Sequence, residues 1–132
     1  MAAVGRRAAE RASEDRDALG RAGEDLAVAW YEGHGYDVLA RNWRCRGGEL
    51  DVVARRGRLH VFCEVKSRSS DAFGLPAEAV GPAKRARLRR LAALWFAAQP
   101  AAPGSGGGRG GPVRFDVACV LAGALEIIED AL

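Results

Sequence analysis

One stretch of sequence decides the fold of this chain: residues 49–66, which read ELDVVARRGRLHVFCEVK. Apolar and polar residues alternate on both sides of a central Gly57-Arg58 pair, as in two strands joined by a tight turn. A two-residue turn that begins with glycine pairs Arg56 with Leu59 and thereby fixes every later pair. We therefore predict an antiparallel β-hairpin of defined register. Strict alternation places Leu50, Val52 and Ala54 on one face of the first strand, opposite to Glu49, Asp51 and Val53.

This register brings acidic side chains together. Asp51 faces Glu64, and Glu49 faces Lys66. Like charges about 4 Å apart repel by roughly 4 kcal/mol at an effective dielectric constant near 20, so a compensating cation is expected. Carboxylate oxygens are ligands of Mg²⁺, with substrate phosphate and water completing its shell. Lys66 lies on the same face as Glu64, where an ammonium orients a water or stabilises charge on a phosphate. Asp51, Glu64 and Lys66 are therefore candidate catalytic residues for hydrolysing a phosphodiester.

Other interpretations of the same hairpin stay open. Glu49 is a further candidate metal ligand, but it serves equally well as a partner for Lys66 or for the amides of the glycine turn. In the structural alternative, Glu49 and Lys66 form an ordinary cross-strand ion pair and Asp51 is solvated.

The distribution of charge favours an anionic partner. The net charge is only +3, but residues 41–90 hold 13 basic and five acidic side chains, a balance of +8. Five of these cations fall within residues 84–90, on a predicted helix. They are either a solvated helix face or contacts to phosphates. The candidate nucleic-acid contacts are Lys84, Arg85, Arg87, Arg89 and, after the hairpin, Arg68.

The remaining segments complete an α/β fold in the order α-β-β-β-α-β-β. Residues 1–19 are expected to be a flexible or frayed helical extension, and residues 20–132 a single domain with a flexible glycine-rich insert at 100–112. Leu88, Leu91, Ala92 and Trp95 form the apolar face of the second helix. The predicted elements besides the hairpin are a helix over Arg21–Glu32, a strand over Tyr36–Trp43, a helix from Ala77 or Pro82 to Ala98, and strands over Val113–Val120 and Leu125–Glu129.

Other reactive residues have structural interpretations. Cys45, Cys63 and Cys119 lack the C-x-x-C spacing of zinc and redox sites and are interpreted as reduced, small apolar side chains. Arg114 and Asp116 are expected to pair with each other.

The chain also resembles a known family on five motifs. They are Gly48-Glu49-Leu50-Asp51, Phe62-Cys63-Glu64-Val65-Lys66-Ser67-Arg68, Phe73-Gly74, Lys84 and Arg114-Phe115-Asp116.

Together these motifs resemble the YraN-like family of small bacterial proteins, which is similar to Holliday-junction resolvases and to restriction-endonuclease-like nucleases. The resemblance covers about residues 20–132 and implies an αβββαβ core, a mixed sheet flanked by helices with the site at one edge. It implies that Asp51 and Glu64 hold Mg²⁺ (or Mn²⁺), that Glu24 on the first helix joins them, and that Lys66 assists catalysis. Leu50 departs from the broader nuclease pattern, which often has proline there.

These observations predict a cytoplasmic, metal-dependent endonuclease that acts on DNA, with branched or junction DNA among its candidate substrates. A homodimer would supply the two sites that symmetric cleavage needs. The alternatives are a nucleic-acid-binding module with a silent or partner-dependent nuclease site, and a scaffold whose basic face binds an acidic protein. No apolar run is long enough to cross a membrane, so no membrane partner is expected.

Overall fold

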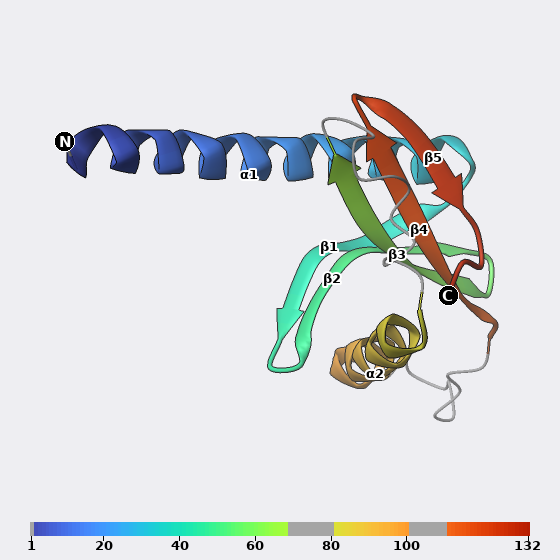
Figure 1. Ribbon diagram of the computed structural model, residues 1–132. Coiled ribbons are helices and arrows are strands. Elements are labelled where there is room, and N and C mark those ends of the chain that lie inside the picture. Colours follow the sequence, from blue (N-terminus) through green and yellow to red (C-terminus); the bar gives the residue numbers. More distant parts are fainter. Residues whose placement is uncertain (1, 69–80, 101–110) are drawn as a thin grey trace.

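The computed structural model describes residues 2–68, 81–100 and 111–132 of the chain. It shows a five-stranded mixed sheet with one helix packed on each face (Figure 1), as the α/β order of the sequence predicts. Phe73-Gly74, Ala77 and most of the glycine-rich insert lie outside the described residues. The elements are α1 (Ala2–Gly33), β1 (Asp37–Cys45), β2 (Gly48–Arg56), β3 (Leu59–Arg68), α2 (Pro82–Ala98), β4 (Val113–Leu121) and β5 (Ala124–Ile128).

The strands lie in sequence order, β1-β2-β3-β4-β5. Only β3 and β4 are parallel, and α2 lies in the connection between them, whereas the other neighbours are antiparallel. The predicted hairpin register is confirmed from Arg56–Leu59 to Val52–Cys63. Gly57 supplies the positive φ (61°) of the turn.

The hairpin ladder ends at Val52–Cys63, which corrects two predictions. Asp51 does not pair with Glu64, and Glu49 does not pair with Lys66. Beyond this point β2 stays paired with β1 down to Cys45–Gly48, and the β1–β2 hairpin curves away from β3 toward α2 (Figure 1). The strands therefore separate where the acidic residues begin.

The alternation of side chains also breaks at this level. Leu50 packs in the core on the α2 side of the sheet, whereas Val52 and Ala54 pack on the α1 side, so the three do not share a face as predicted. On the neighbouring strand, Asn42 has a positive φ of 50° between the pairs Arg41–Val52 and Trp43–Leu50. A left-handed residue re-aims the side chains that follow it on its own strand, and Asn42 lies on β1 beside the point where the facing of β2 changes.

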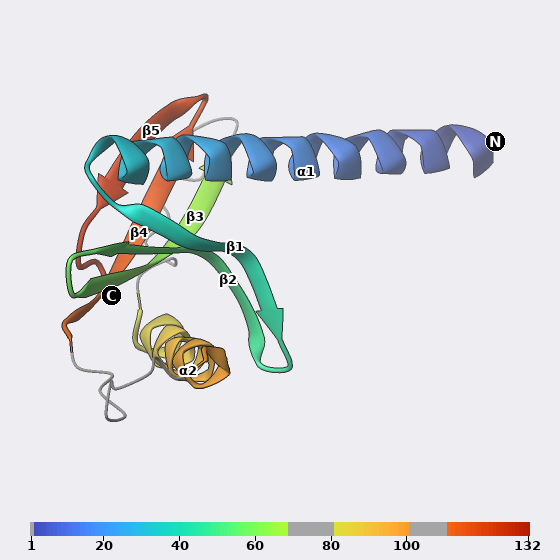
Figure 2. The same ribbon diagram turned by 180° about the vertical axis from the view of Figure 1, so that it is seen from behind.

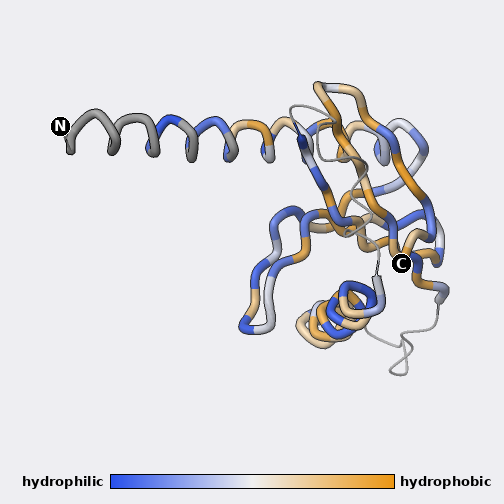
Figure 3. The backbone as a smooth tube through the Cα atoms, in the orientation of Figure 1, coloured by the Kyte–Doolittle hydropathy of each residue, from blue (hydrophilic) through white to orange (hydrophobic). Residues whose placement is uncertain are grey.

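Two cores hold the helices to the sheet. Leu88, Leu91, Ala92 and Trp95 of α2 are buried, as predicted. On the opposite face, α1 contributes buried Ala27, Val28 and Tyr31. Figure 3 shows the hydrophobic segments concentrated along the central strands.

Helix α1 begins well before the predicted Arg21 and runs unbroken from Ala2 to Gly33. Its N-terminal part projects beyond the sheet (Figures 1 and 2). Residues 2–20 are alanine-rich and lack proline, so helical propensity continues through them, and the isolated Gly5 and Gly20 do not end the helix. No described helix is long and apolar enough to cross a membrane.

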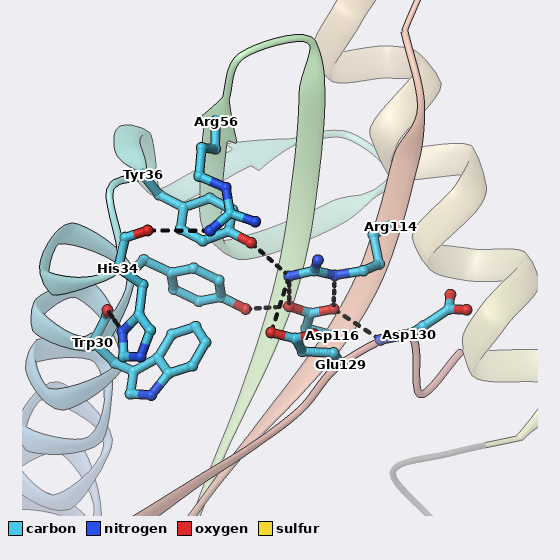
Figure 4. Close-up of polar contacts among 9 residues, drawn as sticks. Trp30, His34, Tyr36, Arg56, Arg114, Asp116, Glu129 and Asp130 are labelled. Atoms are coloured by element: carbon cyan, nitrogen blue, oxygen red, sulfur yellow. Dashed lines mark hydrogen bonds and ion pairs between the residues drawn. The ribbon is translucent and has the colours of Figure 1, made fainter.

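A buried carboxylate joins α1, β4 and the C-terminal residues (Figure 4). Asp116 is fully buried and accepts hydrogen bonds from Tyr31 Oη (2.6 Å) and from the backbone N–H of Asp130 (3.0 Å). It also pairs with Arg114 (Nε to Oδ1, 2.8 Å), which confirms the expected pair. Burial and the carboxylate of Asp116 raise the pKa of Tyr31, while hydrogen bonding to Asp116 raises that of Arg114. This network links β4 to α1 and to the C-terminal residues.

Candidate active site

The predicted site residues come together where β2 and β3 separate. Asp51 lies on β2, Glu64 and Lys66 on β3, Glu24 on α1, and Lys84 on α2. Since β2 and β3 are the second and third of five strands, the site lies at interior strands and not at an outer strand. The loss of the ladder beyond Val52–Cys63 opens this place in the sheet.

Asp51 is held by the backbone of the neighbouring strand. Its Oδ2 accepts a hydrogen bond from Val65 N–H at 2.8 Å. The pKa of Asp51 is raised to about 6, first because the carboxyl is buried and then because of the nearby charges of Glu64, Glu24 and Glu49. The hydrogen bond from Val65 opposes this rise. The clustering of acidic groups expected from the sequence thus exists, although it does not come from cross-strand pairing.

The two carboxylate oxygens of Glu64 have different surroundings. Only 8% of its side chain is exposed. Its Oε1 lies 2.6 Å from Lys84 Nζ, 3.6 Å from Lys66 Nζ and 3.7 Å from Arg87 Nη2. Its Oε2 is buried and has no hydrogen-bond partner among the described residues. A buried carboxylate oxygen without a partner is costly, so this oxygen has the position expected of a ligand for an added group.

Glu24 is placed by Asn42 of β1, which the sequence does not single out, and by the preceding Gly23. Its Oε1 accepts a hydrogen bond from Asn42 Nδ2 at 2.6 Å, and Asn42 is the left-handed residue on β1. The preceding residue, Gly23, packs so closely on β3 that an added Cβ would collide with Ser67 Oγ. Nothing in the local sequence reveals the Asn42 contact, because it joins β1 to α1.

Two small cavities open beside Asp51. The first, of about 240 Å³, is lined by Glu49, Asp51, Glu64, Arg87 and Leu88. The second, of about 280 Å³, is lined by Leu19, Gly20, Glu24, Asp51, Val65, Lys66 and Ser67. Asp51 lines both. Each volume has room for several waters or a hydrated cation.

The candidate site lacks a cluster of three metal ligands among the described residues, but it has two carboxylates that suit Mg²⁺. Within residues 2–68, 81–100 and 111–132, no three histidine, cysteine, aspartate or glutamate side chains are arranged to hold a metal. Mg²⁺, however, is usually bound through one or two carboxylates, with waters and substrate phosphate completing its shell. The buried Oε2 of Glu64, without a described partner, and the carboxyl of Asp51, on the same cavity, fit that pattern.

The predicted nucleic-acid contacts lie in three different places. Lys84 and Arg87 reach Glu64 and belong to the site itself. Arg85 and Arg89, with their neighbour Arg90, are exposed on α2. Arg68 is the last residue of β3.

Glu49 Oε2 lies 3.3 Å from Nε of Arg44, the residue that pairs with Glu49 on the neighbouring strand β1. One interpretation of the sequence expected Lys66 as the partner of Glu49, and the structure shows Arg44 in its place. Residues Cys45, Cys63 and Cys119 are free thiols, as predicted.

Comparison with known proteins identifies related sequences. A family model described as "Uncharacterised protein family UPF0102" matches residues 23–120. A UPF0102 protein of Mycolicibacterium vanbaalenii is 50% identical over 117 residues, covering 89% of this chain and 91% of its own. A UPF0102 protein of Frankia alni is 54% identical over 105 residues, covering 80% and 82%. One from Streptomyces griseus is 52% identical over 106 residues, covering 80% and 84%.

Proposed function

The chain belongs to the UPF0102 family, the YraN-like family that its motifs resemble, and we propose that it is a divalent-metal-dependent endonuclease acting on DNA. Family membership by itself names no reaction, so the proposal is supported by the site. The observation that carries it is the pair of carboxylates on one cavity, half-buried Asp51 and buried Glu64, with three cations around Glu64 Oε1 and no hydrogen-bond partner for its Oε2 among the described residues.

Asp51 and Glu64 would hold the cation, with Glu24 as a third acidic group. A divalent cation in such a site lowers the pKa of a bound water and neutralises charge on a phosphodiester. The pKa of Asp51 is raised to about 6, first by burial and then by the nearby charges of Glu64, Glu24 and Glu49, and a bound cation would favour its ionised form.

The basic side chains at and near the site would supply the positive charge that binds phosphates. Lys66 is 37% exposed, so its ammonium can leave Glu64 and reach a phosphate or an attacking water. Arg87 lines the same cavity as the two carboxylates and is about half exposed. The outward-facing Arg85 and Arg89 would contact flanking phosphates, and such contacts make binding depend steeply on salt.

The test is cleavage of single-stranded, duplex, flapped and four-way DNA by purified protein in Mg²⁺ or Mn²⁺. We expect cleavage by the wild type, none with chelator, and a loss of at least about a hundredfold in Asp51→Asn or Glu64→Gln. Glu32→Gln, at an exposed site near the C-terminal end of α1, is the matched control and should cleave normally. Metal-independent cleavage, or equal cleavage by Asp51→Asn, would refute the proposal.

A nucleic-acid-binding module with a silent nuclease site is the second candidate. It is favoured by the absence of a three-ligand metal cluster in the described part of the chain and by the cations already gathered on Glu64. Salt-sensitive DNA binding without cleavage in any metal would select this candidate.

A further inference from the structure

We propose that Lys84 is a positioning residue: its ammonium holds Glu64 while no divalent cation is bound, and it turns to a substrate phosphate once Glu64 serves a cation. The inference rests on the proposed function for its second half. Its first half concerns cation binding alone and is measurable without DNA.

Lys84 makes the shortest ion pair between α2 and the Glu64 carboxylate on β3. Lys84 Nζ lies 2.6 Å from Glu64 Oε1, closer than Lys66 or Arg87. Its side chain is 18% exposed, about half as much as that of Lys66. Lys84 is therefore the principal cation that keeps the buried Glu64 carboxylate in place.

The position of Lys84 on its helix is unfavourable for the helix itself. Helix α2 begins at Pro82, so Lys84 lies in the first turn, where no acidic residue is present. The helix dipole disfavours a cation at this end and favours an anion. A lysine there needs a specific partner to offset the cost, and Glu64 provides one.

The contacts of Glu64 would allow a divalent cation to take over from Lys84 as its partner. All three cations lie near Oε1, while Oε2 is buried without a described partner. A divalent cation bound between Glu64 and Asp51 would add positive charge beside the Lys84 ammonium, and like charges repel. The long, flexible stem of lysine lets the ammonium move to a nearby anion, and a DNA phosphate is the anion that the proposed reaction supplies.

A purely structural role of the Lys84–Glu64 ion pair leads to a different prediction from a role in which Lys84 gives way to a divalent cation. If Lys84 only anchors α2, its loss would loosen the site, so cation affinity and DNA cleavage would fall together. If Lys84 competes with the cation, its loss would tighten cation binding but slow cleavage, because the phosphate would lose a partner.

The experiment measures Mn²⁺ affinity by calorimetry in the absence of DNA, and then single-turnover DNA cleavage at saturating Mn²⁺. We expect Lys84→Met to bind Mn²⁺ about tenfold tighter, the change for one charge-assisted hydrogen bond that no longer has to be broken. Cleavage should slow by about tenfold or more. Lys84→Arg, which keeps the charge, should stay near wild type in affinity. Arg11→Met, at an exposed site on the N-terminal part of α1 with no role in the proposed site, is the control and should change neither quantity.

The outcomes separate the two proposals. Tighter Mn²⁺ binding by Lys84→Met without DNA cleavage by any variant supports the exchange at Glu64 and refutes the nuclease function. Normal wild-type cleavage with unchanged or weaker Mn²⁺ binding by Lys84→Met overturns the inference alone. Failure of both proteins to bind Mn²⁺ overturns both. Circular dichroism of Lys84→Met, compared with Lys84→Arg, verifies that α2 is retained.

Discussion

Replacement of Asp51 by asparagine should stabilise the protein at neutral pH. Burial and three neighbouring carboxylates raise the pKa of Asp51 from an ordinary 3.8 to about 6. This difference corresponds to about 3 kcal/mol of folding free energy lost when the group ionises. Asparagine does not ionise and keeps an oxygen for the hydrogen bond from Val65 N–H. Asp51→Asn therefore removes an electrostatic cost that the wild type bears.

The sign follows from the direction of the pKa change. Below about pH 4 the carboxyl is protonated in both the folded and the unfolded chain, so ionisation of Asp51 costs no stability. As the pH rises from 4 to about 6 the unfolded chain loses this proton first, and the wild type loses stability. The stability advantage of Asp51→Asn should grow by about 3 kcal/mol between pH 3.5 and pH 7.

Urea denaturation followed by tryptophan fluorescence measures this difference across the pH range. Asp37→Asn, which removes an exposed carboxylate from β1, is the control and should show a much smaller change. A difference between Asp51→Asn and wild type that stays constant from pH 3.5 to pH 7 would refute the reasoning. In saturating Mn²⁺ the ranking should reverse, because a ligand that binds only the folded wild type adds to its stability.

Three further variants test how the fold supports the site. Gly23→Ala should lower the free energy of unfolding by about 1–3 kcal/mol, because the new methyl group meets Ser67 Oγ; adding Ser67→Ala should recover part of that loss, and additive losses would contradict the close approach. Asp116→Ala should cost about 3–5 kcal/mol in chemical denaturation, because it leaves Arg114 without its buried partner; a loss under about 1 kcal/mol would show that the network is dispensable. Burial, together with nearby Arg55, lowers the pKa of His60. The stability contributed by neutral His60 is complete above pH 6.5 and falls as the pH drops through the folded pKa. The free energy of unfolding of wild type should therefore exceed that of His60→Gln by less at pH 5 than at pH 7. A difference that does not change with pH would contradict this prediction.

Several elements of the fold could be predicted because they depend on neighbours in sequence. The glycine turn sets the pairing of Arg56 with Leu59, and this register holds as far as the strands stay together. The apolar stripe of α2, from Leu88 to Trp95, is buried as its helical spacing requires. Asp51 and Glu64 of the hairpin also come to one region, and Glu24, which only the family resemblance places there, lies near them.

The details of the candidate site depend on contacts that local patterns do not encode. A strict alternation predicted that Asp51 faces Glu64, but the β1–β2 hairpin leaves β3 at that level and Val65 N–H holds Asp51 instead. The sequence places Lys84 beside the arginines of its helix. Only the packing of α2 on the sheet separates it from them.

The sequence by itself thus determined the elements, the hairpin register and the residue types available for chemistry, because these follow from backbone preferences and side-chain periodicity over a few residues. The tertiary structure decided which oxygen of Glu64 remains without a described partner, which lysine lies against it and which residue holds Glu24. These contacts join residues on different strands and helices. Their geometry is set by where β2 leaves β3 and by how closely Gly23 lets α1 approach, and both depend on packing across the whole sheet.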